Sequence, residues 1–211
     1  MKTINYSHFV TNTEFLGPYK RSVLWVQGCC FSCEGCIAPE MQKSGGHFAD
    51  TITLADILLG DNSTEGITIS GGEPFLQADA LAEMIETMKS QRNIGVVIYS
   101  GFTLDELKEK SVSDDGVEKL LSMTDILIDG RYIQSLDDGI AYRGSSNQNI
   151  ICLSDRYSEV SKSYYGNFAR KAELKIDKDR LVLVGVPSKN TLETVKNIIN
   201  KARGFNNDRG V

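Results

Sequence analysis

The sequence predicts an α/β protein with a largely parallel sheet, and two observations carry this prediction. Short apolar runs rich in β-branched residues alternate with stretches whose apolar residues recur at helical spacing. Residues that could bind a metal or a ligand stand where each apolar run ends. Alternating strands and helices imply parallel strands joined by right-handed crossovers, with the functional residues at the carboxyl ends of the strands.

The expected elements follow in chain order. Four runs are expected to be buried strands because each is apolar and each ends at glycine or in a polar loop; they cover 22–27, 66–70, 94–100 and 125–129. Helices are expected between them because apolar residues recur there every three or four positions after an Asp or Thr suited to the N-cap; they cover 54–60, 78–90 and 103–110.

The C-terminal part is expected to add a β-hairpin and a helix to this core. Residues 172–186 indicate two strands around a turn at Asp177 to Asp179, and residues 191–202 carry a helical pattern. We expect residues 1–155 to form the core domain and residues 156–211 to be an extension packed on the same domain. Nothing in the composition resembles a linker between them.

Composition and charge limit the classes of partner. The 211 residues carry a formal net charge of −5, which gives no electrostatic footprint for nucleic acid or an anionic membrane. The N-terminus lacks the apolar core of a signal peptide, and no run of about 18 apolar residues occurs. We therefore expect a soluble cytoplasmic protein that binds neither nucleic acid nor membrane.

Four of the five cysteines lie within eight positions, which favours metal ligation in a reducing compartment over a disulfide framework. Structural zinc would need four tetrahedral ligands, and His8 and His47 are isolated from any second cysteine pair. A redox dithiol can be formed from Cys30 and Cys33 or from Cys33 and Cys36, but it does not need a third thiol.

An iron–sulfur cluster fits the spacing better than zinc or a redox dithiol. Cys29, Cys33 and Cys36 form CxxxCxxC, which supplies three thiolates to a four-iron cube. One iron is then left without a protein ligand. An open position of this kind is typical of a metal that binds a reactant.

A second motif, SGGEP at residues 70–74, follows the second predicted strand. Together with CxxxCxxC after the first strand, it resembles the radical S-adenosylmethionine (SAM) superfamily, whose fold is a partial (β/α) barrel. Within that superfamily, four stretches resemble the activating enzyme of anaerobic (class III) ribonucleotide reductase: WVQGC, YSGFTLDEL, ILIDGRY and YRGSSNQ. The resemblance covers about residues 15–155 and implies a partial barrel of the radical SAM type with a C-terminal hairpin and helix extension.

The resemblance implies a mechanism. Cys29, Cys33 and Cys36 would bind a [4Fe-4S] cluster, and the amino and carboxylate groups of SAM would complete the open iron. A flavodoxin or ferredoxin-type reductant would supply the electron that cleaves SAM to methionine and a 5′-deoxyadenosyl radical. That radical would generate a glycyl radical on a partner enzyme, anaerobic ribonucleotide reductase.

The resemblance also implies a set of SAM-binding residues: Ser70, Gly71, Gly72, Glu73, Pro74, Ser100, Gly101, Asp129, Arg143, Ser145 and Asn147. The two glycines would let the backbone approach the ligand, and Glu73 would accept a hydrogen bond from the methionine ammonium. Simpler structural roles stand beside these. Ser100 and Gly101 are ordinary loop residues, Asp129 suits a helix or turn cap, and residues 143–147 suit a surface turn.

The chain departs from the family pattern at several positions. Gly17, Pro18 and Tyr19 replace the Gly-Pro-Gly that the reductase activators usually carry before the first strand, a change expected at the entry to the site. Cys30 creates a register that does not match the family and is expected to stay unligated. Cys152 is expected to be a small buried apolar residue.

Two alternative functions remain open from sequence. One is a radical enzyme acting on a small molecule or a ribosomal peptide, with the C-terminal hairpin and helix covering the site. The other is an iron–sulfur electron carrier or redox sensor. A carrier normally ligates every iron with protein, so the three-thiolate spacing and the SGGEP motif both favour an enzyme.

Overall fold

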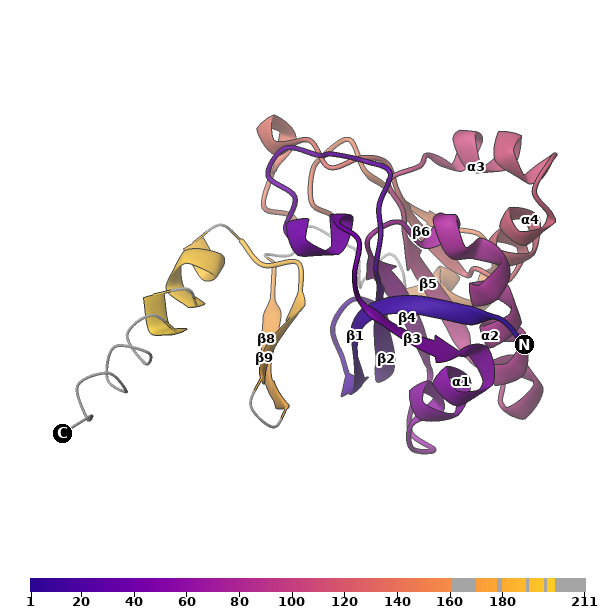
Figure 1. Cartoon of the computed structure of the whole chain (residues 1–211). Helices are drawn as coiled ribbons and strands as arrows, with labels where there is room; N and C mark the ends of the chain where they lie inside the picture. Colours follow the sequence, from indigo (N-terminus) through magenta and orange to yellow (C-terminus); the bar gives the residue numbers. More distant parts are fainter. Residues whose placement is uncertain (161–169, 178–179, 189, 196, 200–211) are drawn as a thin grey trace.

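The computed structural model describes residues 1–160, 170–177, 180–188, 190–195 and 197–199. A seven-stranded sheet in the order β3-β1-β2-β4-β5-β6-β7 forms the body of the molecule, and a separate two-stranded sheet, β8-β9, lies beside it (Figure 1). The fold is therefore mixed α/β with a mostly parallel sheet and a C-terminal hairpin, as the sequence predicts.

The centre of the large sheet is parallel. Its four parallel strands are β2 (Arg21–Val26), β4 (Gly66–Gly71), β5 (Gly95–Tyr99) and β6 (Ile126–Asp129). Nearly all of their residues are buried, as expected of parallel strands covered on both faces. These are the four predicted strands, and their carboxyl ends meet at one edge of the sheet.

Antiparallel strands flank this centre. They are β1 (Thr3–Thr13), β3 (His47–Asp50) and β7 (Asn149–Cys152). β1 pairs with both β2 and β3, and β7 pairs with β6. The sequence analysis did not predict β1 or β3, because these half-exposed strands mix polar and apolar residues instead of forming an apolar run.

Helices cover one face of the sheet (Figure 1): α1 (Thr51–Leu59), α2 (Ala78–Gln91), α3 (Leu104–Ser111) and α4 (Asp115–Ser122). Local caps fix their starts. Asp50 accepts from Thr53 N, so α1 begins three residues earlier than predicted. Thr103 and Glu106 form a capping box at α3, and Asp114 caps α4, a helix that was not predicted.

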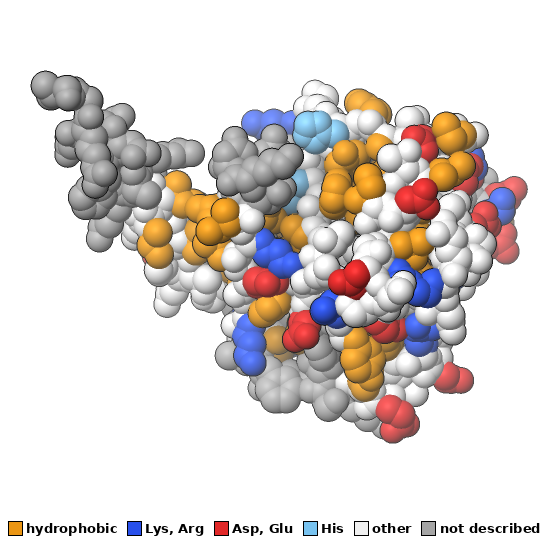
Figure 2. Space-filling model, turned by 90° about the horizontal axis from the view of Figure 1, so that it is seen from below, with side chains coloured by type: hydrophobic (Ala, Val, Ile, Leu, Met, Phe, Trp, Pro, Cys, Tyr) orange, Lys and Arg blue, Asp and Glu red, His pale blue; other side chains and the backbone are white. Residues whose placement is uncertain are grey.

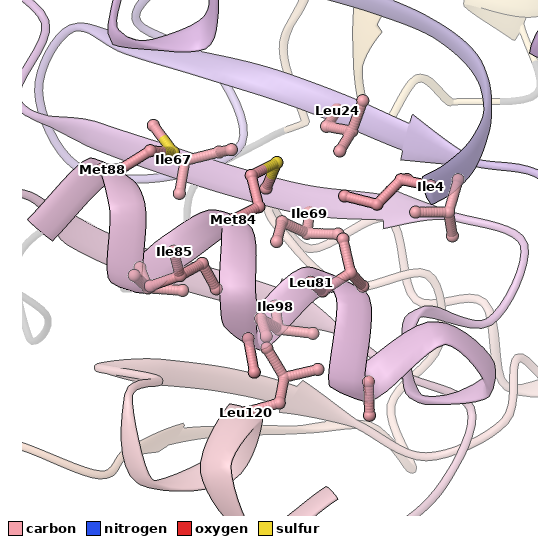
Figure 3. Close-up of a cluster of buried hydrophobic side chains, with 14 of the residues drawn as sticks. Ile4, Leu24, Ile67, Ile69, Leu81, Met84, Ile85, Met88, Ile98 and Leu120 are labelled. Atoms are coloured by element: carbon pink, nitrogen blue, oxygen red, sulfur yellow. The ribbon is translucent and has the colours of Figure 1, made fainter. Parts of the chain in front are cut away.

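The main core lies between these helices and the sheet, with α2 in its middle (Figure 3). Side chains of α2 that point to one face meet the inward side chains of β1, β2, β4 and β5. The labelled residues in this layer are Ile4, Leu24, Ile67, Ile69, Leu81, Met84, Ile85, Met88, Ile98 and Leu120. Each fully buried side chain of this size contributes about 1.5–3 kcal/mol, so this layer stabilises the packing of the helices on the sheet.

The C-terminal hairpin packs on the opposite face of the sheet. β8 (Ala172–Asp177) and β9 (Arg180–Gly185) pair as predicted, although turn residues 178–179 lie outside the described residues. Val184 is fully buried in a second cluster with Val23 and Trp25. Trp25 is therefore a core residue, and it stacks on His8 at 4.4 Å between ring centroids.

The other face of the hairpin is exposed and apolar. Leu174, Ile176 and Leu181 are all more than 40% exposed. Helical residues 190–195 and 197–199 follow, with Ile198 also exposed. The rest of the predicted helix, residues 196 and 200–202, lies outside the described residues. Figure 2 shows apolar side chains gathered on this projecting C-terminal part. None of the described helices has the length and apolar character to cross a membrane.

Two expectations are wrong. Cys152 is exposed instead of buried, because β7 is an edge strand of the sheet and Cys152 is its last residue. Gly17 to Tyr19 precede the amino end of β2, whereas the cysteines follow its carboxyl end, so these residues are not at the entry to the site. There Pro18 O accepts a hydrogen bond from the buried Arg21.

Candidate active site

The cysteine loop, residues 28–41, begins just beyond the carboxyl end of β2. A hydrogen bond from Gly28 N to Met41 O, 2.8 Å long, closes the loop at its base. Cys29, Cys33 and Cys36 are half-buried free thiols. Cys30 is also free but exposed to solvent. The three predicted ligands therefore share one short loop above the parallel strands.

The end of β4 lies so close to this loop that side chains are excluded. A Cβ on Gly72 would stand 2.0 Å from Gly28 O, and one on Gly71 would stand 2.5 Å from Val26 O. Backbone hydrogen bonds of 2.8 Å run from Gly72 N to Val26 O and from Glu73 N to Gly28 O. The two glycines are thus required by the packing of protein backbone, and their approach to a ligand stays a prediction.

The residues flanking these glycines complete the strand end. Ser70 pairs with Trp25 across β2 and β4 and is half-buried. Pro74 begins the short helix η2 (Pro74–Gln77), where its fixed φ suits the first helical turn. The SGGEP motif therefore turns the chain sharply from β4 and directs the side chain of Glu73 into the protein.

Glu73 is fully buried and is held by three hydrogen bonds. Its Oε1 accepts from Phe75 N at 3.0 Å and from Ser100 Oγ at 2.9 Å, and its Oε2 accepts from Gly101 N at 2.7 Å. Burial raises the pKa of Glu73 to about 7, although these hydrogen bonds oppose the shift. Because a carboxylate has about four acceptor sites, one site remains for a further donor.

Ser100 and Gly101, which follow β5, both contact Glu73 directly. Ser100 N also donates to Ile128 O at 2.9 Å, which ties the end of β5 to β6. On its other side Gly101 touches Phe31: a Cβ there would stand 2.5 Å from two carbons of the Phe31 ring. Sequence reasoning missed Phe31, because a phenylalanine inside a cysteine motif carries no signal of its tertiary contacts.

The structure gives Asp129 the contacts of a cap. Its Oδ2 accepts from Leu104 N, the first residue of α3, at 2.7 Å. Its Oδ1 accepts from Asn149 Nδ2 at 2.9 Å. Asp129 is 2% exposed, so these hydrogen bonds compensate its burial. A contact with SAM stays a prediction for this residue.

Arg143, Ser145 and Asn147 have the contacts of an ordered turn. Arg143 donates to Asp138 in an ion pair. Ser145 Oγ donates to Asn147 Oδ1 at 2.7 Å, and Asn147 Nδ2 donates to Arg131 O at 2.8 Å. These contacts fold the chain after β6 back onto itself. Binding of a ligand by these side chains also stays a prediction.

An open depression of about 580 Å³ lies beside the cysteine loop. Glu34 lines it from the loop, and residues 132–135 line it from the segment after β6. The Gln134 side chain lies against Gly35, where a Cβ would stand 2.9 Å from it, and Gly35 has a φ of +72°. The cysteine loop and the segment after β6 therefore form a common wall.

The donor set fits an iron–sulfur cube. Among the described residues, no three His, Cys, Asp or Glu side chains converge on one metal ion. A four-iron cube takes one thiolate per iron, so its ligands need not converge on a single point. Burial raises the pKa of the Cys29 thiol, and metal coordination would ionise it.

Comparison with known proteins defines the class. The sequence pattern of the family described as "4Fe-4S single cluster domain" matches residues 15–151, which include the cysteine loop, Glu73 and Asp129. The chain belongs to this family and is a radical SAM enzyme that uses a [4Fe-4S] cluster and SAM.

Its relatives are activating proteins. The anaerobic ribonucleoside-triphosphate reductase-activating protein of Vibrio cholerae serotype O1 is 30% identical over 156 residues, which cover 70% of this chain and 97% of that protein. The protein of the same name from Enterobacteria phage T4 is 24% identical over 72% of this chain and 96% of its own length. A pyruvate formate-lyase-activating enzyme of Staphylococcus aureus (strain USA300) is 26% identical over 80% of this chain and 69% of that protein. The chain is accordingly a radical SAM enzyme of the glycyl-radical-activating class.

Proposed function

We propose that the partner on which this enzyme generates a glycyl radical is an anaerobic ribonucleotide reductase. The observation that carries this proposal is the match to the Vibrio cholerae activating protein over 97% of that protein's length. When bound, the reduced cluster supplies the electron that cleaves SAM and so provides the radical that abstracts hydrogen from the partner. The role of the chain itself is to hold the cluster and SAM and to exclude water.

Three thiolates are proposed to hold the cluster: Cys29, Cys33 and Cys36. Their CxxxCxxC spacing, their free state and their common loop support this assignment. Glu73 is proposed to accept a hydrogen bond from the methionine ammonium with its remaining acceptor site. A buried carboxylate gains from such a donor, because a hydrogen bond to its ionised form offsets part of the cost of burying its charge.

The other predicted SAM-binding residues are proposed to line or shape the site around Glu73. Ser70, Gly71, Gly72 and Pro74 set the turn that carries it, and Ser100 and Gly101 hydrogen-bond its carboxylate. Asp129, Arg143, Ser145 and Asn147 are proposed to form the wall on the β6 side. Their hydrogen bonds to protein support a positioning role there.

We infer that the large sheet is a partial barrel of the radical SAM type whose lateral opening admits a loop of the partner. Residues 1–155 would form this core, and residues 156–211 would be an extension packed on it, supported by burial of Val184 against the sheet. The reductant is proposed to be a flavodoxin or ferredoxin-type protein in the cytoplasm.

The cysteine register can be tested together with the chemistry. Anaerobically reconstituted protein with dithionite should bind close to four irons per chain and convert SAM to 5′-deoxyadenosine and methionine. Cys33→Ala should lose both the iron and the products. Cys30→Ala, the matched control in the same loop, should keep both.

Three outcomes would each contradict part of this assignment. Equal cluster loss in Cys30→Ala and Cys29→Ala would refute the ligand register. A fully clustered and reduced protein that releases neither product would favour an electron carrier or sensor. If SAM is cleaved but only a peptide or small molecule is modified, the alternative radical enzyme with the hairpin as a cover gains support.

A further inference from the structure

Phe31 lies inside the cysteine loop and contacts residues that follow two different strands. Its ring touches Gly101 after β5, where a Cβ would come within 2.5 Å of ring carbons Cδ2 and Cε2. Phe102 meets it edge to face, with 4.8 Å between the ring centroids and 67° between the planes. The Arg131 guanidinium after β6 covers the ring at 4.7 Å from its centroid. Phe31 therefore joins the cysteine loop to the ends of β5 and β6.

The same glycine joins Phe31 to Glu73. Gly101 presents its Cα surface to the Phe31 ring, while its N–H donates to Glu73 Oε2 at 2.7 Å. Gly101 is thus the single residue that lies between the Phe31 ring and the buried carboxylate of Glu73. A side chain at residue 101 would separate the loop from the strand end, so only glycine permits this contact.

The cysteine loop needs such an anchor. Residues 28–38, all of them described, form no helix or strand. Backbone hydrogen bonds hold the base of the loop, from Gly28 N to Met41 O and from Glu73 N to Gly28 O. Phe31, which is half-buried, adds a side-chain contact between the positions of the first and second cysteine ligands.

We propose that Phe31 is a positioning residue that holds the cysteine loop in register with Glu73. The proposal rests on the ligand roles proposed above for the cysteines and for Glu73. In the proposed complex, SAM would reach the open iron with its amino and carboxylate groups while an N–H of the same amine donates to Glu73. The spacing between the loop and the Glu73 carboxylate would then decide whether both contacts form together. Small misplacements of such groups weaken binding and slow reaction strongly.

A double-mutant cycle on Phe31 and Gly101 tests this proposal. Gly101→Ala introduces a methyl group where the ring stands, so the ring and loop must move. Phe31→Ala removes the ring and leaves room for that methyl group. We therefore expect the double variant to behave like Phe31→Ala alone, since the second change finds no ring to displace.

The first measurement uses the apoprotein and is independent of the cluster. Hydrogen exchange of the amides of residues 29–36 should be at least tenfold faster in Phe31→Ala and in Gly101→Ala than in the unmodified protein, and no faster in the double variant than in Phe31→Ala.

The second measurement uses reconstituted protein. Each variant should keep close to four irons, because all three thiols remain, but the Kd for SAM should rise about tenfold. The change that SAM causes in the electron paramagnetic resonance spectrum of the reduced cluster should shrink correspondingly.

Two further variants serve as controls. Phe48→Ala removes an exposed phenylalanine on β3 and should change none of these values. Phe31→Tyr keeps the ring and should bind SAM within about threefold of the unmodified protein, which a general loss of stability would not explain.

Additive effects of Phe31→Ala and Gly101→Ala on exchange would overturn the proposal, because the glycine would then act independently of the ring. Unchanged exchange and unchanged SAM affinity in Phe31→Ala would also overturn it. If the unmodified protein fails to bind SAM, the proposed function fails, and the exchange cycle in the apoprotein still decides whether Phe31 anchors the loop.

Discussion

Glu73 is a buried carboxylate just beyond the end of β4, and burial changes the pH at which it ionises. Glu73 has no solvent access, and its three hydrogen-bond donors come from the turn after β4 and the end of β5. These donors are neutral, so they favour the ionised form less than a cation would. Burial therefore keeps the pKa of Glu73 raised to about 7 despite these three donors.

This placement predicts a pH dependence of stability in the apoprotein. The pKa of Glu73 is raised to about 7 in the fold from 4.5, so folding favours its protonated form. That stabilisation is fully present below pH 4.5 and is lost as the pH rises through about 7, by up to roughly 3 kcal/mol. Denaturant unfolding of the unmodified protein and of Glu73→Gln, compared from pH 5 to 8, should show this loss only in the unmodified protein.

SAM should reverse the trend. The N–H groups of its iron-bound amine would favour ionised Glu73 as their acceptor, so the affinity for SAM should rise as the pH rises through about 7. Identical pH profiles in the unmodified protein and in Glu73→Gln, for both stability and SAM affinity, would contradict the assigned role.

At the scale of elements, the side chain of Asp129 connects the end of β6 to α3 and to β7. Its Oδ2 caps α3 through Leu104 N, and its Oδ1 binds the first residue of β7, Asn149. One buried side chain therefore joins three elements, β6, α3 and β7.

Asp129→Ala should therefore cost stability. The change leaves the N-terminus of α3 and the amide of Asn149 without their acceptor, and the expected loss is about 1–3 kcal/mol of unfolding free energy. Chemical denaturation measures it. Ser146→Ala, a change of a more exposed side chain in the segment after β6, is a suitable control and should change stability by less than about 0.5 kcal/mol. If Asp129→Ala keeps full stability but no longer binds SAM, Asp129 is a ligand residue and not a cap.

Local signals explain what could be predicted at this scale. The four parallel strands are apolar runs, and α3 begins next to a local cap, Thr103, so both kinds of element were predictable. β1 was missed because its residues gain their burial only by pairing with β2. The three cysteines were singled out from their spacing, and their role as cluster ligands stays a prediction. The contact of Phe31 with Gly101 could not be predicted, since it depends on where two strands end in space.

At the scale of the whole molecule, the two ends of the parallel strands differ. Near the amino ends, Arg21 and Tyr157 are buried, and Tyr157 OH donates to Glu65. The Gly95 position lies against Tyr157, so this end is filled by side chains. The cysteine loop, Glu73 and the open depression are at the carboxyl ends, where enzymes with parallel β/α architecture carry their chemistry.

The hairpin stabilises the face of the sheet that the helices leave free. Val184 packs with Val23 and Trp25, and Lys175 donates to two backbone carbonyls of β1. The side chain of Arg170, just before the hairpin, binds Asp137 and the carbonyl of Gly144. The extension is therefore attached both to β1 and to the segment after β6.

Removing residues 171–211 keeps Arg170 and tests this bracing role. The free energy of unfolding should fall by at least about 2 kcal/mol, because the burial around Val184 is lost. Fluorescence of Trp25, the only tryptophan, should shift to the red as the ring gains water. Ile176→Ser, at an exposed position of the hairpin, should leave both values unchanged. A truncated protein that stays stable but cleaves SAM without substrate turnover would favour the hairpin as a cover for a small-molecule site.

The transfer of one hydrogen atom from a glycine of the partner tests the central claim most directly. Cognate anaerobic reductase labelled with α-deuterated glycine is mixed anaerobically with this protein, reductant and SAM. The account predicts 5′-deoxyadenosine that carries one deuterium and a resonance on the reductase that is a doublet with unlabelled glycine and collapses with the label. Unlabelled 5′-deoxyadenosine formed at the normal rate, with no radical on the reductase, would contradict it.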